Sequence, residues 1–319
     1  MNSRVCCVLL LGVLATALGG CLTQTSLDYY LKGQLAAQQG QIDTALTALD
    51  DAIEKNPRMG LAYMARGEVF KLKGQFEQAA LDFLKVTSIE PYNFQAHYQL
   101  GLMYQYLKRF TDSIDAYQKA VAIRPLDPEA NMSLASVYAQ IGEPLRGLAY
   151  AQRAVQGDDN SAIAHANLGL LYSQNGEVDR AIDEYKKSIE LDGRQSEVYL
   201  NLAVEFVKQS KFEQARNVLE TAVAMGPSAA VSERLGVCYY KLGNMQKATE
   251  AYSESLRQNP NYHLALNGLG VVAMTRSLKT TPPNVDLAKE AVAYWHRSLA
   301  LQPEQPAIQQ LVKKYAGTQ

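Results

Sequence analysis

The sequence lacks an excess of charge of either sign, and this argues against one large class of function. Its 319 residues include 31 Lys and Arg against 32 Asp and Glu, which gives a formal net charge of −1. Proteins that bind nucleic acid through its phosphates need a basic surface or stripe. We therefore expect no nucleic-acid partner. Disorder is not expected either, because 47% of the residues are hydrophobic and 20% are charged.

Cysteine is scarce outside the N-terminal region. Cys6, Cys7 and Cys21 lie within the first 21 residues, and Cys238 is the fourth and last cysteine. Residues 22–319 therefore cannot form an internal disulfide, even in an oxidising compartment. Cys238 falls within an apolar helical pattern and has no paired base, so we interpret it as a buried packing thiol.

Sequence motifs for catalysis, phosphate binding and metal binding are also missing. There is no GxxxxGK phosphate loop and no GxSxG elbow. The four histidines have no metal-ligand spacing such as HExxH: His97, His165, His263 and His296. We expect structural roles for His97 and His165, which occupy corresponding positions in two predicted helices. The sequence predicts no metal, no cofactor and no enzymatic activity.

The first twenty residues have the pattern of a secretory signal. Residues 1–4 are short and positively charged, and Val5 to Leu18 form an apolar run without charge. This run of about 14 residues is shorter than the roughly 20 residues that a membrane-spanning helix needs. The segment Leu18-Gly19-Gly20-Cys21 follows it. An ordinary signal peptide with a cysteine at its cleavage site would give the same pattern.

The segment Leu18-Gly19-Gly20-Cys21 resembles a bacterial lipobox. The resemblance implies that residues 1–20 are a lipoprotein signal peptide, that Cys21 is lipidated, and that residues 21–25 form a lipidated tether. Several acyl chains on one cysteine would hold the protein firmly to a membrane. In the sorting rule of enterobacterial lipoproteins, Leu22 after the cysteine favours the outer membrane. We expect a lipid anchor on the periplasmic face of that membrane.

The remainder of the chain repeats itself every 34 residues, as the spacing of Gly33, Gly67 and Gly101 shows. In a frame that starts at Ser26, small residues occupy the eighth position of each repeat: Gly33, Gly67, Gly101, Ala135, Gly169, Ala203, Gly236 and Gly270. The twentieth position is also small: Ala45, Ala79, Ser113, Gly147, Ala181, Ala215, Ala248 and Ala291. Apolar residues recur at helical spacing between them. Two helices per repeat, in close contact at the small residues, explain this pattern.

This pattern resembles the tetratricopeptide repeat. The resemblance implies an all-α fold, an α-solenoid superhelix of about eight helix-turn-helix repeats over residues 26–304, closed by a capping helix and tail at 305–319. The expected repeats are residues 26–59, 60–93, 94–127, 128–161, 162–195, 196–228, 229–262 and 263–304. Glycines such as Gly40 and Gly176 are expected to end the first helix of a pair in a left-handed conformation. An insertion in the last repeat, Thr275 to Val285, is expected to be an exposed loop.

In this family the inner residues of the first helices line a concave groove. The expected groove residues are Tyr98, Tyr106, Asn167, Asn201, Arg234 and Tyr240. Asn167 and Asn201 hold equivalent positions in consecutive repeats. A side-chain amide offers a donor and an acceptor, so a pair of them can hold the backbone of an extended peptide. The alternative is that both bind only water.

The leading functional hypothesis is a lipid-anchored periplasmic scaffold that binds an extended peptide or partner protein and assists assembly of an envelope complex. Its partners would be an envelope protein and, through Cys21, the membrane. Lipoproteins of this repeat family include the pilotins of type IV pili, so a role in pilus or secretin assembly is one alternative. A structural homo-oligomer is another. We expect no catalytic domain, because the capping helix is the last predicted element.

Overall fold

The computed structural model describes residues 24–316, and every regular element in that part of the chain is a helix. Residues 1–23, with the predicted signal peptide and Cys21, lie outside the described residues. The chain divides into two compact units, Met1–Lys108 and Arg109–Gln319, which we describe separately. No helix of the described residues is long and apolar enough to cross a membrane.

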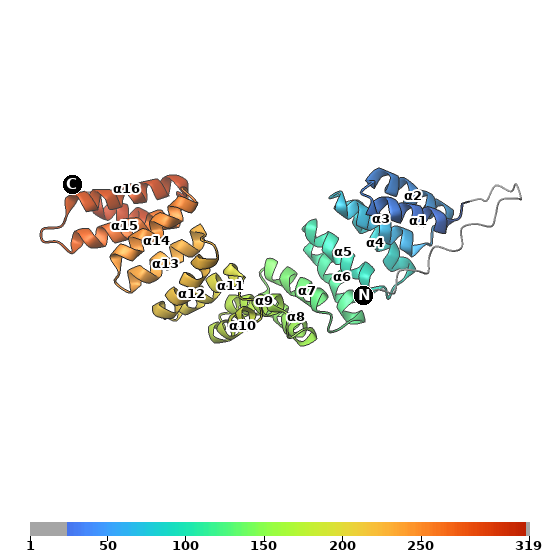
Figure 1. Cartoon of the computed structure of the whole chain (residues 1–319), viewed down its shortest axis with the longest axis horizontal. Coiled ribbons are helices and arrows are strands. Elements are labelled where there is room, and N and C mark those ends of the chain that lie inside the picture. The colour runs from blue at the N-terminus through green and yellow to red at the C-terminus, as the bar shows by residue number, and fades with distance from the viewer. Residues whose placement is uncertain (1–23, 317–319) are drawn as a thin grey trace, which may run out of the picture. The chain divides into compact units, whose positions relative to one another are not determined.

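The described part of the first unit contains five helices (Figure 1). They are α1 (Ser26–Gln38), α2 (Ile42–Lys55), α3 (Gly60–Leu72), α4 (Phe76–Ile89) and α5 (Phe94–Tyr106). Each packs against the helix that follows it in the unit, so that α1 contacts α2 and α3 contacts α4. The helices thus form consecutive pairs.

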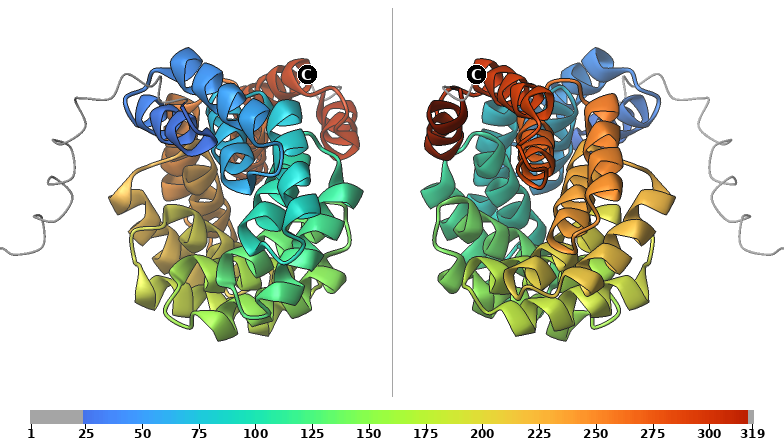
Figure 2. Two further views of the ribbon diagram at one scale, coloured as in Figure 1. Left: turned by 90° about the vertical axis from the view of Figure 1, so that its right-hand side faces the viewer. Right: turned by 90° about the vertical axis from the view of Figure 1, so that its left-hand side faces the viewer.

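The described part of the second unit continues the same arrangement over twelve helices. They are α6 (Phe110–Ile123), α7 (Pro128–Gln140), α8 (Pro144–Gly157), α9 (Ala162–Gln174), α10 (Val178–Leu191), α11 (Ser196–Lys208), α12 (Phe212–Met225), α13 (Ala229–Lys241), α14 (Met245–Gln258), α15 (His263–Leu278), α16 (Val285–Leu301) and α17 (Pro306–Tyr315). Neighbours in sequence are neighbours in space, and pairs such as α9 and α10 stack in chain order (Figure 2). The predicted fold class, an all-α solenoid of paired helices with a C-terminal helix, is confirmed.

A glycine on the first helix of most pairs contacts a large side chain on the second helix. A Cβ atom on Gly236 would lie 2.7 Å from a ring carbon of Tyr252, and one on Gly270 would lie 2.3 Å from Trp295 Nε1. Gly67 meets Phe83 in the same way, and Gly169 meets Tyr185. These large side chains are among the least exposed in the protein: Phe83, Tyr185, Tyr252 and Trp295. The close approach of two helices therefore requires the small residue that the sequence repeats.

Where alanine replaces glycine at this position, the opposing residue is smaller. Ala135 and Ala203 take the glycine position in two repeats, and the residues at the place of the aromatic ring are Ala151 and Leu219. All four are buried. In these two repeats a smaller residue thus takes the place that an aromatic ring fills elsewhere.

We expect Gly236→Ala to reduce the free energy of unfolding by about 1–3 kcal/mol, because the added methyl group overpacks the contact with Tyr252. In the double variant Gly236→Ala/Tyr252→Leu, the two changes should cost less than the sum of the single changes, since Ala203 and Leu219 form such a combination naturally. Denaturant unfolding of the four proteins measures the coupling. Strictly additive costs would contradict the interlocked packing.

The turn inside a helix pair requires a residue with positive φ. Five glycines adopt it, with φ between 71° and 80°: Gly40, Gly74, Gly142, Gly176 and Gly243. Lys108 and Ser210 adopt it in two further repeats, with φ of 58° and 59°. The predicted glycine turns are confirmed. The two turns without glycine were not predicted, because neither side chain indicates a left-handed conformation.

We expect Ser210→Gly to stabilise the second unit by up to about 1 kcal/mol, because glycine adopts positive φ without the steric cost that other residues carry there. The reverse exchange, Gly176→Ser, should destabilise it by a similar amount. Thermal unfolding of both variants tests the pair. Loss of stability from Ser210→Gly would show that the serine side chain matters more than the backbone conformation.

The C-terminal helix covers the last apolar face of the second unit. Ile308 on α17 is buried, and the rings of Trp295 and Tyr315 lie 6.2 Å apart. The expected capping helix is therefore present. The expected loop over Thr275 to Val285 is partly wrong, because α15 continues to Leu278 and only the residues up to Asn284 form the connection. The insertion thus lengthens a helix and also adds a loop.

Candidate functional site

A hollow in the second unit lies over α9 and α11, the first helices of two consecutive repeats. We call it the α9–α11 hollow. It encloses about 460 Å³ and is lined by Ile163, Ala166, Asn167 and Leu170 from α9, and by Arg194, Gln195, Ser196, Glu197, Val198 and Asn201 from the start of α11 and the residues before it. The predicted pair, Asn167 and Asn201, thus lines one hollow.

The two asparagines keep much of their hydrogen-bonding capacity. Asn167 is exposed, and its amide nitrogen makes only a long contact of 3.7 Å with Met132 Sδ. Asn201 is half-buried, and within residues 24–316 no hydrogen bond of its side chain is seen. Both amides can therefore donate and accept hydrogen bonds with a bound backbone.

Apolar side chains flank Asn167 on the same helix. Ile163 is 59% exposed and Leu170 is 39% exposed, although both are large aliphatic residues. They lie four residues before and three residues after Asn167, so they share its face of the helix. A hollow that combines exposed amides with exposed aliphatic groups can hold a peptide backbone and cover an apolar side chain.

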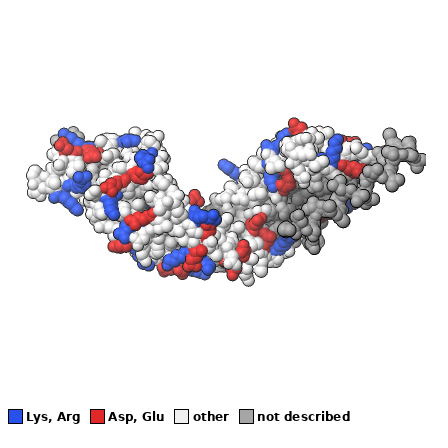
Figure 3. All heavy atoms as spheres, in the orientation of Figure 1, with Lys and Arg blue, Asp and Glu red and all other residues white. Residues whose placement is uncertain are grey.

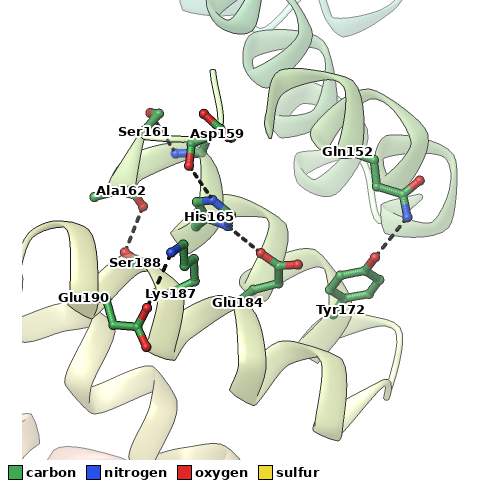
Figure 4. Close-up of polar contacts among 11 residues, drawn as sticks. Gln152, Asp159, Ser161, Ala162, His165, Tyr172, Glu184, Lys187, Ser188 and Glu190 are labelled. Carbon is green, nitrogen blue, oxygen red and sulfur yellow. Dashed lines mark hydrogen bonds and ion pairs between the residues drawn. The ribbon is translucent and has the colours of Figure 1, made fainter. Parts of the chain in front are cut away.

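Polar contacts at its N-terminal end fix the position of α9 (Figure 4). Ser161 Oγ caps the helix by accepting from the Ala164 amide at 3.2 Å, and Ser188 Oγ on α10 donates to the Ala162 carbonyl at 2.8 Å. The His165 ring lies between two acceptors, 2.6 Å from Glu184 Oε2 and 3.1 Å from the Asp159 carbonyl oxygen. His165 therefore links α9 to α10 and to the preceding loop, two residues before Asn167 on the same helix.

A buried carboxylate connects the two helices that line the hollow. Glu205 lies on α11, one turn beyond Asn201, and is 1% exposed. Its Oε1 accepts from Ser173 Oγ on α9 at 2.6 Å and from Lys208 Nζ at 2.7 Å. The sequence interpretation missed Glu205. The signal was available, because the corresponding position of other repeats holds an apolar residue such as Val137 or Leu171.

The predicted tyrosines of the groove lie on α5 in the first unit. Tyr98 is half-buried and stacks on Phe94 with ring centres 6.1 Å apart. Tyr106 stacks on Phe76 at 4.7 Å and is still 56% exposed. Neither lines the α9–α11 hollow. Their assignment to a binding surface stays a prediction.

The remaining predicted groove residues lie on α13. Arg234 Nε is 3.5 Å from Glu233 Oε2, and the Tyr240 hydroxyl is 3.1 Å from Thr275 Oγ1 on α15. Neither lines the α9–α11 hollow. Their place in a binding surface also stays a prediction. Of the six predicted groove residues, the hollow brings together the two asparagines.

The ionisable groups of residues 24–316 are not arranged as a metal site requires. In the described residues, no group of three or more His, Cys, Asp or Glu is placed to hold a metal ion. Cys238 is fully buried, and burial raises the pKa of its thiol to about 11. On the face drawn in Figure 3, basic and acidic side chains of the described residues are interspersed.

Glu233 is an unfavourable buried acid. It is 5% exposed, and its Oε2 accepts no hydrogen bond within the described residues, although Arg234 Nε lies 3.5 Å away. Burial raises the pKa of its carboxyl group and outweighs the opposing effect of the Arg234 charge. Because the folded-state pKa is raised, Glu233 favours folding most at low pH, and this contribution is lost as the pH rises through the folded-state value.

We therefore expect Glu233→Gln to raise the melting temperature at pH 8, because ionising this carboxyl group costs more in its buried site than in the unfolded chain. The difference from the native protein should shrink as the pH falls from the raised folded-state pKa toward about 4.3, the ordinary pKa of a glutamic acid, and should stay constant below it. Melting curves from pH 4 to 8 test this. A difference that does not change with pH would mean that packing, and not charge, decides the effect.

Comparison with protein families identifies the fold. A model of the tetratricopeptide repeat matches residues 30–95, 133–195 and 200–263, and a second tetratricopeptide repeat model matches residues 94–126. These segments cover more than half of the chain, and the chain belongs to the tetratricopeptide repeat family. No curated protein matches the chain.

Several solved structures share this fold. A chain of the APC/C hetero-tetramer Cut9–Hcn1 matches 90% of this chain at 17% identity with a TM-score of 0.59, and 54% of that chain is covered. This protein thus spans about half of that neighbour's length. A tetratricopeptide repeat protein from Parabacteroides merdae matches 77% of this chain and 98% of its own, at 16% identity with a TM-score of 0.55. MamA matches 54% of this chain and 94% of its own, at 22% identity with a TM-score of 0.51. At these identities the likeness shows the fold alone.

Proposed function

We propose that this protein is a membrane-anchored periplasmic scaffold that binds an extended peptide segment of a partner protein in the α9–α11 hollow. The tetratricopeptide repeat fold suggests a scaffold for protein–protein interaction. The proposal of peptide binding depends on the α9–α11 hollow, and the proposal of a membrane anchor depends on the N-terminal sequence.

The observation that carries the proposal is the pair of equivalent amides on consecutive repeats. Asn167 and Asn201 line one hollow, and exposed Ile163 and Leu170 lie beside them. Amides can pair with a peptide backbone without reading its sequence, while the aliphatic groups favour an apolar side chain. Arg194 and Glu197 at the rim supply charges of both signs. This chemistry suits a mixed-sequence peptide better than a polyanion.

The membrane anchor is supported by the sequence at the N-terminus. Leu18-Gly19-Gly20-Cys21 follows an uncharged apolar run, and a lipid on Cys21 would place the repeats at the periplasmic face of the outer membrane. The roles as a pilotin or as a structural homo-oligomer stay predictions from the sequence.

The test is a pull-down from solubilised envelope with the native protein and the variant Asn167→Ala/Asn201→Ala. We expect the variant to bind the partner with an affinity about thirtyfold lower, because two backbone hydrogen bonds of roughly 1 kcal/mol each are lost. Both side chains line an open hollow, so the variant should fold normally, as circular dichroism would verify.

A matched control is Asn217→Ala on α12, since Asn217 is an exposed asparagine that does not line the hollow. The control should retain the partner as the native protein does. Equal retention by all three proteins would refute binding in the α9–α11 hollow.

A further inference from the structure

The first helix of the chain has an apolar stripe that faces solvent. Leu27, Leu31 and Leu35 on α1 are 52%, 53% and 56% exposed. They are four residues apart, so they lie along one face of the helix. We call this face the α1 leucine stripe. The opposite face of α1, with Tyr30, Gly33 and Ala36, is buried within the first unit.

Leu35 occupies a position that is buried in later repeats, as at Val137 and Leu171, but the polar residues beside the stripe oppose the stacking of another repeat on it. At the third and seventh positions of a first helix, α9 has Ala164 and Leu168, and both are buried. In α1 the same positions hold Asp28 and Lys32, and both are exposed. A further helix stacked in the manner of the repeats would bury this charged pair at a cost of several kcal/mol. The stripe is thus apolar, while its border is charged.

The position of the stripe along the chain indicates what covers it. Cys21 precedes Thr25 by four residues, and Thr25 is the N-cap of α1. A capping box fixes this start, with Thr25 Oγ1 accepting from the Asp28 amide at 3.2 Å and Asp28 Oδ2 accepting from the Thr25 amide at 2.8 Å. Four residues span at most about 14 Å, which is less than half the thickness of a bilayer. A lipid on Cys21 would therefore hold α1 against the membrane surface.

We propose that the α1 leucine stripe lies in the headgroup region of the lipid bilayer and orients the first repeat on the membrane. This inference rests on the proposed anchor at Cys21. Helices that lie in the plane of a membrane combine an apolar face with a charged border, and α1 has both. Lys32 can extend its ammonium group to the lipid phosphates while its methylene groups stay near the stripe.

The experiment uses the full chain, purified from the envelope and reconstituted in vesicles of phosphatidylethanolamine and phosphatidylglycerol. An environment-sensitive fluorophore is attached to Leu31→Cys, and in a control protein to Leu72→Cys on α3. Leu72 is also exposed, at 70%, and belongs to the same unit. Cys238 is buried and should not compete for the label.

The fluorophore at position 31 should shift to the blue, and bromolipids should quench it about twofold more strongly than the one at position 72. Mass spectrometry shows whether Cys21 is acylated. If it is, equal emission and quenching at the two positions would overturn the proposal that the stripe lies in the bilayer, and would leave the anchor at Cys21 intact. Absence of acyl groups on Cys21 would refute both the anchor and this inference. Energy transfer between copies labelled at position 31, without quenching by lipid, would overturn the lipid assignment in favour of a second copy of the chain.

Discussion

The contact between a glycine on one helix and a large side chain on its partner is the constraint on which the rest of the structure depends. Gly169 admits the Tyr185 ring because it has no Cβ, and this fixes the distance and the rotation of α9 against α10. Two residues along a helix correspond to a rotation of about 200°. Asn167, two residues before Gly169, therefore points away from the pair and into the α9–α11 hollow. Asn201 has the same relation to Ala203, and Leu31 to Gly33.

The repeated packing thus supplies a series of outward positions that each repeat can fill differently. In α9 and α11 the position holds an amide, and in α1 it holds a leucine beside the chain segment that leads to Cys21. The packing that builds the fold is nearly the same in every repeat, so the differences between repeats carry the function. The two proposals both concern outward positions that differ between repeats. One assigns the α9–α11 hollow to a peptide, and the other assigns the α1 leucine stripe to lipid. Neither requires an additional domain or a reactive group.

Much of the architecture could be predicted from the sequence, because packing repeats with the period of the chain. The glycine positions, the helix pairs, the C-terminal helix and the pairing of Asn167 with Asn201 all follow from that period. The left-handed turn at Ser210 falls 34 residues after Gly176, so it could be predicted from the period, although serine itself does not favour this conformation. The extension of α15 to Leu278 was not predicted, because Pro282 and Pro283 indicate a loop in this segment. The period marks Glu205 as an exception at an apolar position, but it does not show that Ser173 and Lys208 lie within hydrogen-bond distance of its carboxyl group.

The central claim is that a partner protein occupies the α9–α11 hollow in the cell. A photoreactive amino acid placed at position 167, and in a second protein at position 217, tests it most directly in intact cells. Both positions are exposed asparagines of the second unit, on α9 and α12. The account predicts a discrete crosslinked partner from position 167 and none from position 217. The same products from both positions, or products from position 217 alone, would contradict it.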